Sequence, residues 1–189
     1  MKHIIKFYPV ENADCTLIKL SNGMTIIVDC QLFDNLNDEE GNQIRYEVKK
    51  DLLKELGTDC NGYPYVDLFV STHPHDDHCN GFEGNFYHGN PDEYDSKKNA
   101  NEIIIGELWV TPRGIGNELA DSAETIRQEA KRRRNLYDDN KNFVGNYGNF
   151  LRIVGYNKQA TFDVRYGYVP GTLVTTIDGQ DMTWLEMFI

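Results

Sequence analysis

The sequence predicts an α/β fold, in which sheets are covered by helices. Short strand-like segments follow one another along the chain, and two segments with helical spacing of apolar residues interrupt them. The chain has 189 residues, of which 40% are apolar and 12% aromatic, and this suffices for one core of ordinary size. Because no repeat, low-complexity tract or long linker divides the sequence, we expect residues 1–189 to form a single domain.

The chain begins with three predicted strands, at 4–10, 15–20 and 24–30. The second and third are joined by Ser21-Asn22-Gly23, and an Asn-Gly pair favours the positive φ angles of a tight turn. The third strand contains a continuous apolar run and ends in a carboxylate, Asp29. We therefore expect a hairpin whose last strand ends in an acidic side chain.

A helix is predicted at 44–56 and a further buried strand at 66–70. The helix places four apolar residues on one face, and Gly57 is a suitable end for it. Those four residues are Val48, Leu52, Leu53 and Leu56. The strand runs directly into His73, so the histidines that follow are expected on the loop at its carboxyl end.

In the second half of the chain, predicted strands and a predicted helix again follow one another. A polar stretch rich in Asn and Gly, 80–101, is expected to be a surface loop or a flap, and a strand follows at 103–110. The next helix is expected to begin at Asn117, with the basic run 131–134 in its last, solvated turn. Its apolar face is formed by Leu119, Ala123, Ile126 and Ala130. The last predicted strands are 150–154, 172–177 and 183–189.

Charge and composition narrow the possible partners. The formal net charge of -11 repels polyanions, so binding to nucleic acid or to an anionic membrane is disfavoured. No segment is long and apolar enough for a membrane span, and the first apolar run is too short for a signal peptide. The four cysteines lack the spacing of a disulfide framework, so reduced thiols are expected. These features favour a cytoplasmic protein.

Three histidines and an aspartate follow strand 66–70 within six residues, in the order His73, His75, Asp77, His78. Imidazole nitrogens and carboxylate oxygens are the usual protein ligands of zinc and related divalent ions. Because alternate residues of an extended segment point the same way, His73 and His75 are expected to share one ion, and Asp77 and His78 a second. Such a pair of ions activates water for hydrolysis.

This motif resembles the His-x-His-x-Asp-His pattern of the metallo-β-lactamase superfamily, without a mismatch. Asp29 is similar to an aspartate that supports the metal loop in that family, and 107–112 is similar to its next strand. The resemblance implies an αββα sandwich, of which residues 1–189 are expected to be the N-terminal portion. The start of the chain is loosely similar to the hydrolase-like domain of competence DNA-uptake proteins.

The sequence departs from that family in its downstream ligands. The resemblance implies a further histidine, a bridging aspartate and a last histidine, but no histidine follows His88. His88 itself is expected to be a surface or substrate-facing residue rather than a ligand. Asp178 is a formal candidate for the bridging aspartate, although Asp178-Gly179 is better explained as a hairpin turn. With four ligands for two ions, we expect partial metal occupancy in this chain alone.

Two functions remain open from the sequence. The first is a metal-dependent hydrolase that carries two divalent ions, zinc above manganese or iron, with Asp77 as ligand and proton acceptor. It would cleave an ester or phosphodiester bond in a small-molecule or phosphodiester substrate, and nucleic acid stays possible although the charge does not favour it. The second is a noncatalytic fragment or subunit that acts through protein interaction. In either case a homo-oligomer or a second chain is a candidate source of the missing ligands.

Overall fold

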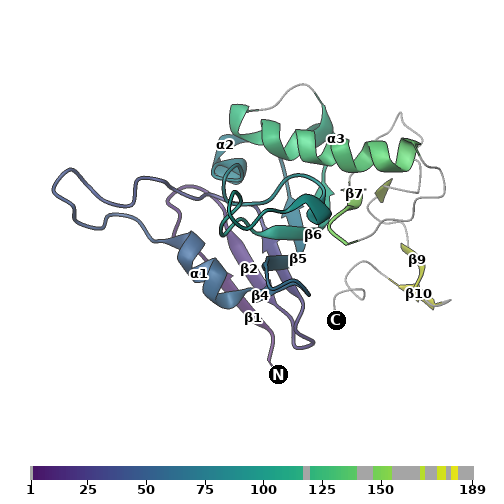
Figure 1. The fold of residues 1–189 in the computed structure, drawn as a ribbon, viewed down its shortest axis with the longest axis horizontal. Coiled ribbons are helices and arrows are strands. Elements are labelled where there is room, and N and C mark those ends of the chain that lie inside the picture. The colour runs from purple at the N-terminus through teal and green to yellow at the C-terminus, as the bar shows by residue number, and fades with distance from the viewer. Residues whose placement is uncertain are drawn as a thin grey trace.

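The computed structural model describes residues 2–116, 120–139 and 147–154, together with the strand residues 167–168, 174–177 and 180–182. Its main feature is an eight-stranded mixed sheet (Figure 1). Seven strands follow the order β1-β2-β3-β5-β6-β7-β8, and β4 pairs with the first two residues of β5, Pro64 and Tyr65. They are β1 (Ile4–Phe7), β2 (Thr16–Lys19), β3 (Thr25–Val28), β4 (Gly57–Thr58), β5 (Pro64–Ser71), β6 (Ile104–Val110), β7 (Phe150–Val154) and β8 (Gly167–Tyr168).

Helices alternate with these strands, which confirms the predicted α/β class. The α-helices are α1 (Val48–Glu55), α2 (Asp76–Cys79) and α3 (Glu124–Asp139). Short 3₁₀ turns are η1 (Pro91–Glu93), η2 (Pro112–Ile115) and η3 (Asp121–Ala123). A separate antiparallel pair is formed by β9 (Val174–Ile177) and β10 (Gln180–Met182). None of the helices within the described ranges is long and apolar enough to cross a membrane.

The main core lies on the face of the sheet that carries α1 and α3. Side chains directly opposite one another on β2, β3, β5, β6 and β7 form a continuous row that is at most 1% exposed. The row consists of Leu17, Ile27, Phe69, Leu108 and Leu151. Apolar residues of α1 and α3 pack against this face, and Figure 1 shows α1 beside β1 and β2 and α3 beside β6 and β7.

Parallel pairing sets the position of the histidine loop, residues 72–75 between β5 and α2. Strands β3, β5, β6 and β7 run in parallel, so their carboxyl ends lie at one edge of the sheet. The segments that leave this edge include Asp29 after β3, Thr72 after β5 and Thr111 after β6. Ligands of open α/β sheets commonly bind at such an edge. The predicted placement of the histidines after a strand is therefore confirmed.

The first predicted helix is shorter than expected. It begins at Val48 rather than at Ile44, because the residues before it do not reach the core: Ile44 is 58% exposed and Tyr46 is 43% exposed. Val48 and Leu52 are the helix residues that the sheet buries, at 2% and 0% exposure. Tertiary packing, rather than helix propensity, thus determines where α1 begins.

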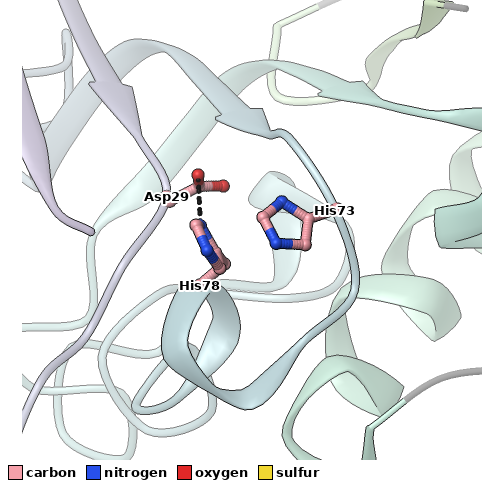
Figure 2. Close-up of side chains that lie close together, drawn as sticks. All are labelled: Asp29, His73 and His78. Carbon is pink, nitrogen blue, oxygen red and sulfur yellow. Dashed lines mark hydrogen bonds and ion pairs between the residues drawn. The ribbon is translucent and has the colours of Figure 1, made fainter. Parts of the chain in front are cut away.

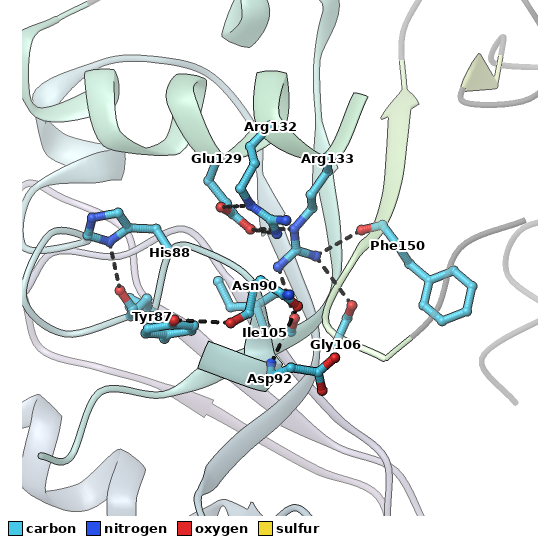
Figure 3. A network of polar contacts seen from close by, with 11 residues as sticks. Tyr87, His88, Asn90, Asp92, Ile105, Gly106, Glu129, Arg132, Arg133 and Phe150 are labelled. Carbon is cyan, nitrogen blue, oxygen red and sulfur yellow. Dashed lines mark hydrogen bonds and ion pairs between the residues drawn. The ribbon is translucent and has the colours of Figure 1, made fainter. Parts of the chain in front are cut away.

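The predicted end of the second helix was wrong. Helix α3 continues to Asp139, so 131–134 lies in its middle and not in a solvated last turn. Tyr137 is 5% exposed and gives the additional turn a contact with the core. Arg133 is 1% exposed and points from α3 into the sheet (Figure 3). The helix begins at Glu124 after η3, whereas Leu119 and the expected cap Asn117 lie outside the described residues.

The stretch 80–101 has no strand or α-helix, as expected for a loop, but it is not simply a surface flap. Four of its aromatic side chains are buried: Phe82, Phe86, Tyr87 and Tyr94. The two phenylalanines pack edge-on against Phe69 of β5, with ring centroids 5.3 and 4.9 Å away. The aromatic residues of this loop are therefore part of the core, and its polar residues lie over them.

Near the C-terminus, two observed strands match predicted ones. Strand β7 coincides with the predicted 150–154, and β9 lies within the predicted 172–177. Strands β8 and β10 were not predicted, since each contains three residues or fewer. The predicted strand 183–189 and the candidate Asp178 lie outside the described residues.

Candidate metal centre

The three histidines gather on the loop between β5 and α2. His75 is the extended residue just before α2, and the short helix carries Asp77 and His78. The ring centroid of His73 lies 4.7 Å from that of His75 and 3.6 Å from that of His78. Figure 2 shows the His73 and His78 rings side by side, with Asp29 next to His78. A strand end followed by one helical turn thus brings four predicted ligands together.

Asp29 holds this loop from the neighbouring strand. It is 2% exposed, and its carboxylate accepts hydrogen bonds from the Thr72 amide (2.8 Å), the Thr72 hydroxyl (2.5 Å) and Nδ1 of His78 (2.8 Å). Its own amide donates to the carbonyl of Val70 at 2.9 Å. Its φ of 54° is in the left-handed region, which aspartate tolerates better than most residues. The backbone at Asp29 therefore turns the carboxylate toward the loop.

Two overlapping sets of donor atoms are compact enough to hold a divalent ion. One set is His73, His75 and Asp77, and the other is Asp29, His73 and His78. Within each set the donor atoms lie within 4.8 Å of one another. An Oδ2 atom of Asp77 also lies 3.5 Å from Nε2 of His78. Nitrogen and carboxylate oxygen donors at these separations fit zinc, manganese or iron.

The side chains of the candidate metal centre differ in how far they are buried. The side chains of Asp29 and His78 are 3% and 10% exposed, whereas that of Asp77 is 51% exposed and His75 also faces solvent. Burial, and then the neighbouring rings of His78 and His75, lower the pKa of His73 below its usual value. A neutral imidazole is the form that binds metal. The centre thus has buried residues, Asp29 and His78, on one side and solvent-exposed residues, His75 and Asp77, on the other.

Asp14 belongs to this centre, and sequence reasoning did not assign it a role. Its Oδ2 atom lies 3.6 Å from Nδ1 of His78, and its amide donates to the carbonyl of Asp77 at 3.1 Å. The side chain of Asp14 is 69% exposed. Nothing in the local pattern of 11–15 distinguishes this aspartate from a turn residue, because its contact depends on how β1 and β2 are placed beside α2.

Further contacts fix the loop from both sides. The amide of Cys30 donates to the His78 carbonyl at 2.9 Å, and the buried Cys79 thiol lies 3.6 Å from the His73 carbonyl. On the other side, the amide of Ala120 donates to the Pro74 carbonyl at 3.1 Å. The hydroxyl of Ser122 donates to Asp76 at 2.6 Å. The segment after β3 and the segment that precedes α3 therefore hold the histidine loop and the start of α2 in place.

His88 lies apart from these donors. It is exposed, and its Nδ1 is 3.5 Å from the carbonyl of Phe86, in the part of the fold that Figure 3 shows. It belongs to neither compact donor set of the described residues.

No family model, curated protein sequence or solved structure matches this chain. The chemistry of the site residues is therefore the main basis for assigning a function.

Proposed function

We propose that this protein is a metal-dependent hydrolase that cleaves an ester or phosphodiester bond. The observation that carries the proposal is the convergence of His73, His75 and Asp77 beside the hydrogen-bonded pair of His78 and Asp29. Clustered imidazoles and carboxylates at the carboxyl edge of a parallel sheet suit divalent ions and are open to a substrate.

Two divalent ions, with zinc as the first choice and manganese or iron as alternatives, would be held by His73, His75, Asp77 and His78. When bound, such ions supply Lewis acidity that activates water and polarises the scissile bond. Occupancy is proposed to be partial, because His73 belongs to both compact donor sets and the described residues offer few further ligands.

Asp29 is proposed to act through His78 rather than as a ligand. Its carboxylate accepts the Nδ1 proton at 2.8 Å, which leaves Nε2 of His78 free and directed to the side where Asp77 lies 3.5 Å away. Carboxylate–histidine pairs of this kind fix the tautomer and orientation of a ligating imidazole. Asp77, with its side chain 51% exposed, is the proposed proton acceptor on the open side.

The fold we propose is the metallo-β-lactamase-like αββα sandwich, of which the described residues would form the first sheet and its helices. Helices on one face of the main sheet and an apolar opposite face support this proposal. Ile26, Leu68 and Trp109 on the opposite face are 3–8% exposed and have further apolar neighbours. A parallel sheet normally has both faces covered, so a second layer would suit this face.

The proposed substrate is small. The formal net charge of -11 disfavours a long polyanion such as nucleic acid, and four carboxylates, Asp14, Asp29, Asp76 and Asp77, lie beside the histidine loop. Bound cations would offset these charges locally and allow a single phosphate or ester group to approach.

The alternative function is a noncatalytic subunit that keeps the loop for protein interaction. The sharing of His73 between both donor sets favours this alternative, because it leaves each ion with few ligands. Metal content distinguishes the two. A noncatalytic subunit would contain no zinc, manganese or iron above background after purification and reconstitution, whereas the proposed hydrolase would retain metal through desalting.

The test combines metal analysis with turnover of a chromogenic phosphodiester and a chromogenic carboxylic ester. The wild type, reconstituted with zinc or manganese, is expected to hydrolyse one of them. His75→Ala and Asp77→Asn should lower turnover by about 100-fold or more, since each removes a proposed ligand. His88→Ala is the matched control, because it removes an exposed histidine outside both donor sets.

Equal turnover of His75→Ala and His88→Ala would show that the activity does not arise at this centre. Metal retention without turnover of either substrate would keep the metal site and reject these two substrate classes.

A further inference from the structure

Strand β1 forms an edge of the main sheet and presents apolar side chains to solvent. It pairs with β2 on one side, and no strand within the described residues pairs with its other side. Ile4, Ile5 and Phe7 are 46%, 57% and 79% exposed. An exposed apolar edge strand is a template for pairing with another strand, and most proteins protect such edges.

The edge strand also directs main-chain groups away from β2. The amide of Tyr8 donates to the carbonyl of Cys15, so residue 8 directs its main-chain groups toward β2. Main-chain groups of alternate residues in an antiparallel ladder point the same way. Ile4 and Lys6 therefore face β2 with their main chains, and Ile5 and Phe7 direct theirs outward.

The usual protection by charge is absent from this edge. Lys6, the charged residue of β1, is held inward by Asp51 at 2.9 Å and Glu55 at 2.8 Å on α1. Its ammonium is therefore not presented along the edge. Pro9 follows the strand and does not interrupt it.

We propose that β1 pairs with β1 of a second copy of this chain, in an antiparallel two-fold ladder centred on Ile5. In this register Ile5 lies opposite Ile5 of the second copy, and Phe7 lies opposite His3. All of these residues direct main-chain groups outward, so the ladder would gain about six hydrogen bonds. The exposed side chains of Ile5 and Phe7 would become partly buried.

Neighbouring registers are less favourable. A ladder centred on Lys6 would place two lysines directly opposite each other, and like charges in that position destabilise a sheet. A ladder centred on Phe7 would place Pro9 opposite Ile5, and proline has no amide hydrogen to donate. Of these three registers, the sequence of the edge favours the one centred on Ile5.

Charge complementarity supports a second copy as the occupant. In the proposed register Lys2 of one copy lies opposite Tyr8 of the other. The Tyr8 hydroxyl donates to Asp51 at 2.9 Å, so the carboxylate of Asp51 is close to the position that Lys2 would reach. Lys2 is exposed in this structure. The two-fold axis would generate this lysine–aspartate contact twice.

The apolar face of the sheet would also continue across the pair. Ile5 lies opposite Ile18, Ile18 opposite Ile26, and Ile26 opposite Leu68. Exposure along this row falls from 57% at Ile5 to 3% at Leu68. A second copy beside Ile5 would shield the most exposed end of the row.

Sedimentation velocity of the full chain over a range of concentrations tests the proposal. The wild type is expected to form a dimer, and higher salt should favour it because salt screens the repulsion between two acidic chains. Ile5→Lys should raise the dimer dissociation constant by about tenfold or more, and Lys2→Glu should weaken the dimer less strongly. Ile44→Lys is the matched control, since Ile44 is 58% exposed but lies outside β1.

A wild type that stays monomeric at high concentration and high salt would overturn the proposal. So would a dimer that Ile5→Lys leaves intact, or one that Ile44→Lys weakens equally. If β1 instead pairs only with a peptide from another protein, the wild type will stay monomeric at high concentration and high salt. Circular dichroism melting of Ile5→Lys checks that the variant is folded, and because the side chain is exposed we expect an unchanged transition.

Discussion

At the scale of single residues, Asp29 links backbone geometry to the chemistry of the site. Its left-handed φ of 54° places the carboxylate where it accepts three hydrogen bonds from Thr72 and His78. Alanine would disturb both the backbone and the hydrogen bonds, because it tolerates this φ poorly. Asparagine keeps the backbone preference and removes the charge, so Asp29→Asn isolates the contribution of the carboxylate.

We predict that Asp29→Asn weakens zinc binding by about 10- to 100-fold, the range observed when the hydrogen-bond partner of a ligating histidine is replaced. The physical reason is that an amide cannot hold the Nδ1 proton of His78 as a carboxylate does. Competition with a chelating dye measures the affinity. Asp34→Asn is the control, because Asp34 is exposed and follows the same strand. Equal affinities of the two variants would contradict the role of Asp29.

At the scale of elements, one buried arginine joins α3 to two strands. Arg133 donates to the carbonyls of Ile105 (3.0 Å) and Gly106 (3.3 Å) on β6 and of Phe150 (2.9 Å) on β7, as Figure 3 shows. Its Nε donates to Glu129 at 2.6 Å, and both side chains are 1% exposed. A buried charge is tolerated when it is paired and fully hydrogen-bonded, so this arginine fixes the helix on the sheet.

Replacing Arg133 should therefore be costly. Arg133→Met is expected to lower the free energy of unfolding by about 3–5 kcal/mol, since it removes the arginine donor of three carbonyl groups and leaves the buried Glu129 with the partly exposed Arg132. Urea denaturation measures the change. Arg127→Met on the same helix is the control, because Arg127 forms a surface pair with Glu124 and its loss should change little. A comparable loss in both variants would disprove the anchoring role of Arg133.

A second link between elements depends on pH. Glu55 at the end of α1 accepts from Lys6 of β1 at 2.8 Å and from Lys19 of β2 at 2.9 Å. These hydrogen bonds, from Lys6 first and then Lys19, lower the pKa of Glu55 from 4.5 to about 2. A carboxyl whose pKa is lower in the folded state stabilises the fold above its ordinary pKa and loses this effect as pH falls through the lowered value.

We therefore predict that Glu55→Gln reduces the loss of stability between pH 4.5 and about 2 and lowers stability at pH 7. Urea denaturation at a series of pH values gives the slope for each protein. Glu39→Gln, in an exposed part of the loop before α1, serves as the control and should keep the slope of the wild type. A Glu55→Gln slope equal to that of the wild type would refute the prediction.

At the scale of the whole molecule, the histidine loop and the start of α2 join parts of the chain that are far apart in sequence. Asp14, Asp29, Pro74 and Ala120 meet there, from the segments around β2, β3, β5 and α3. Binding of an ion would tie these segments together in the folded state only, because the ligands are dispersed when the chain unfolds. Metal should thus stabilise the entire fold rather than the loop alone.

Added zinc is accordingly predicted to raise the melting temperature of the wild type. A free concentration of 100 times the dissociation constant contributes about 2.7 kcal/mol, which corresponds to a shift on the order of 5–10 °C for a chain of this size. Differential scanning calorimetry measures the shift, and a chelator should reverse it. Asp77→Asn should show a much smaller shift. An identical shift in that variant would mean that zinc stabilises the protein at another place.

The sequence by itself determined the α/β class, the strands β3, β5, β6 and β7, and the position of the histidine motif at the end of β5. Each of these depends on residues close together in the chain, so local periodicity and spacing are enough to predict them. Only the tertiary structure decided that Asp14 meets His78, that α3 extends past a buried Arg133, and that β1 is the edge strand of the sheet that the structure describes. These features depend on strand order and on contacts through space, which a local pattern does not encode.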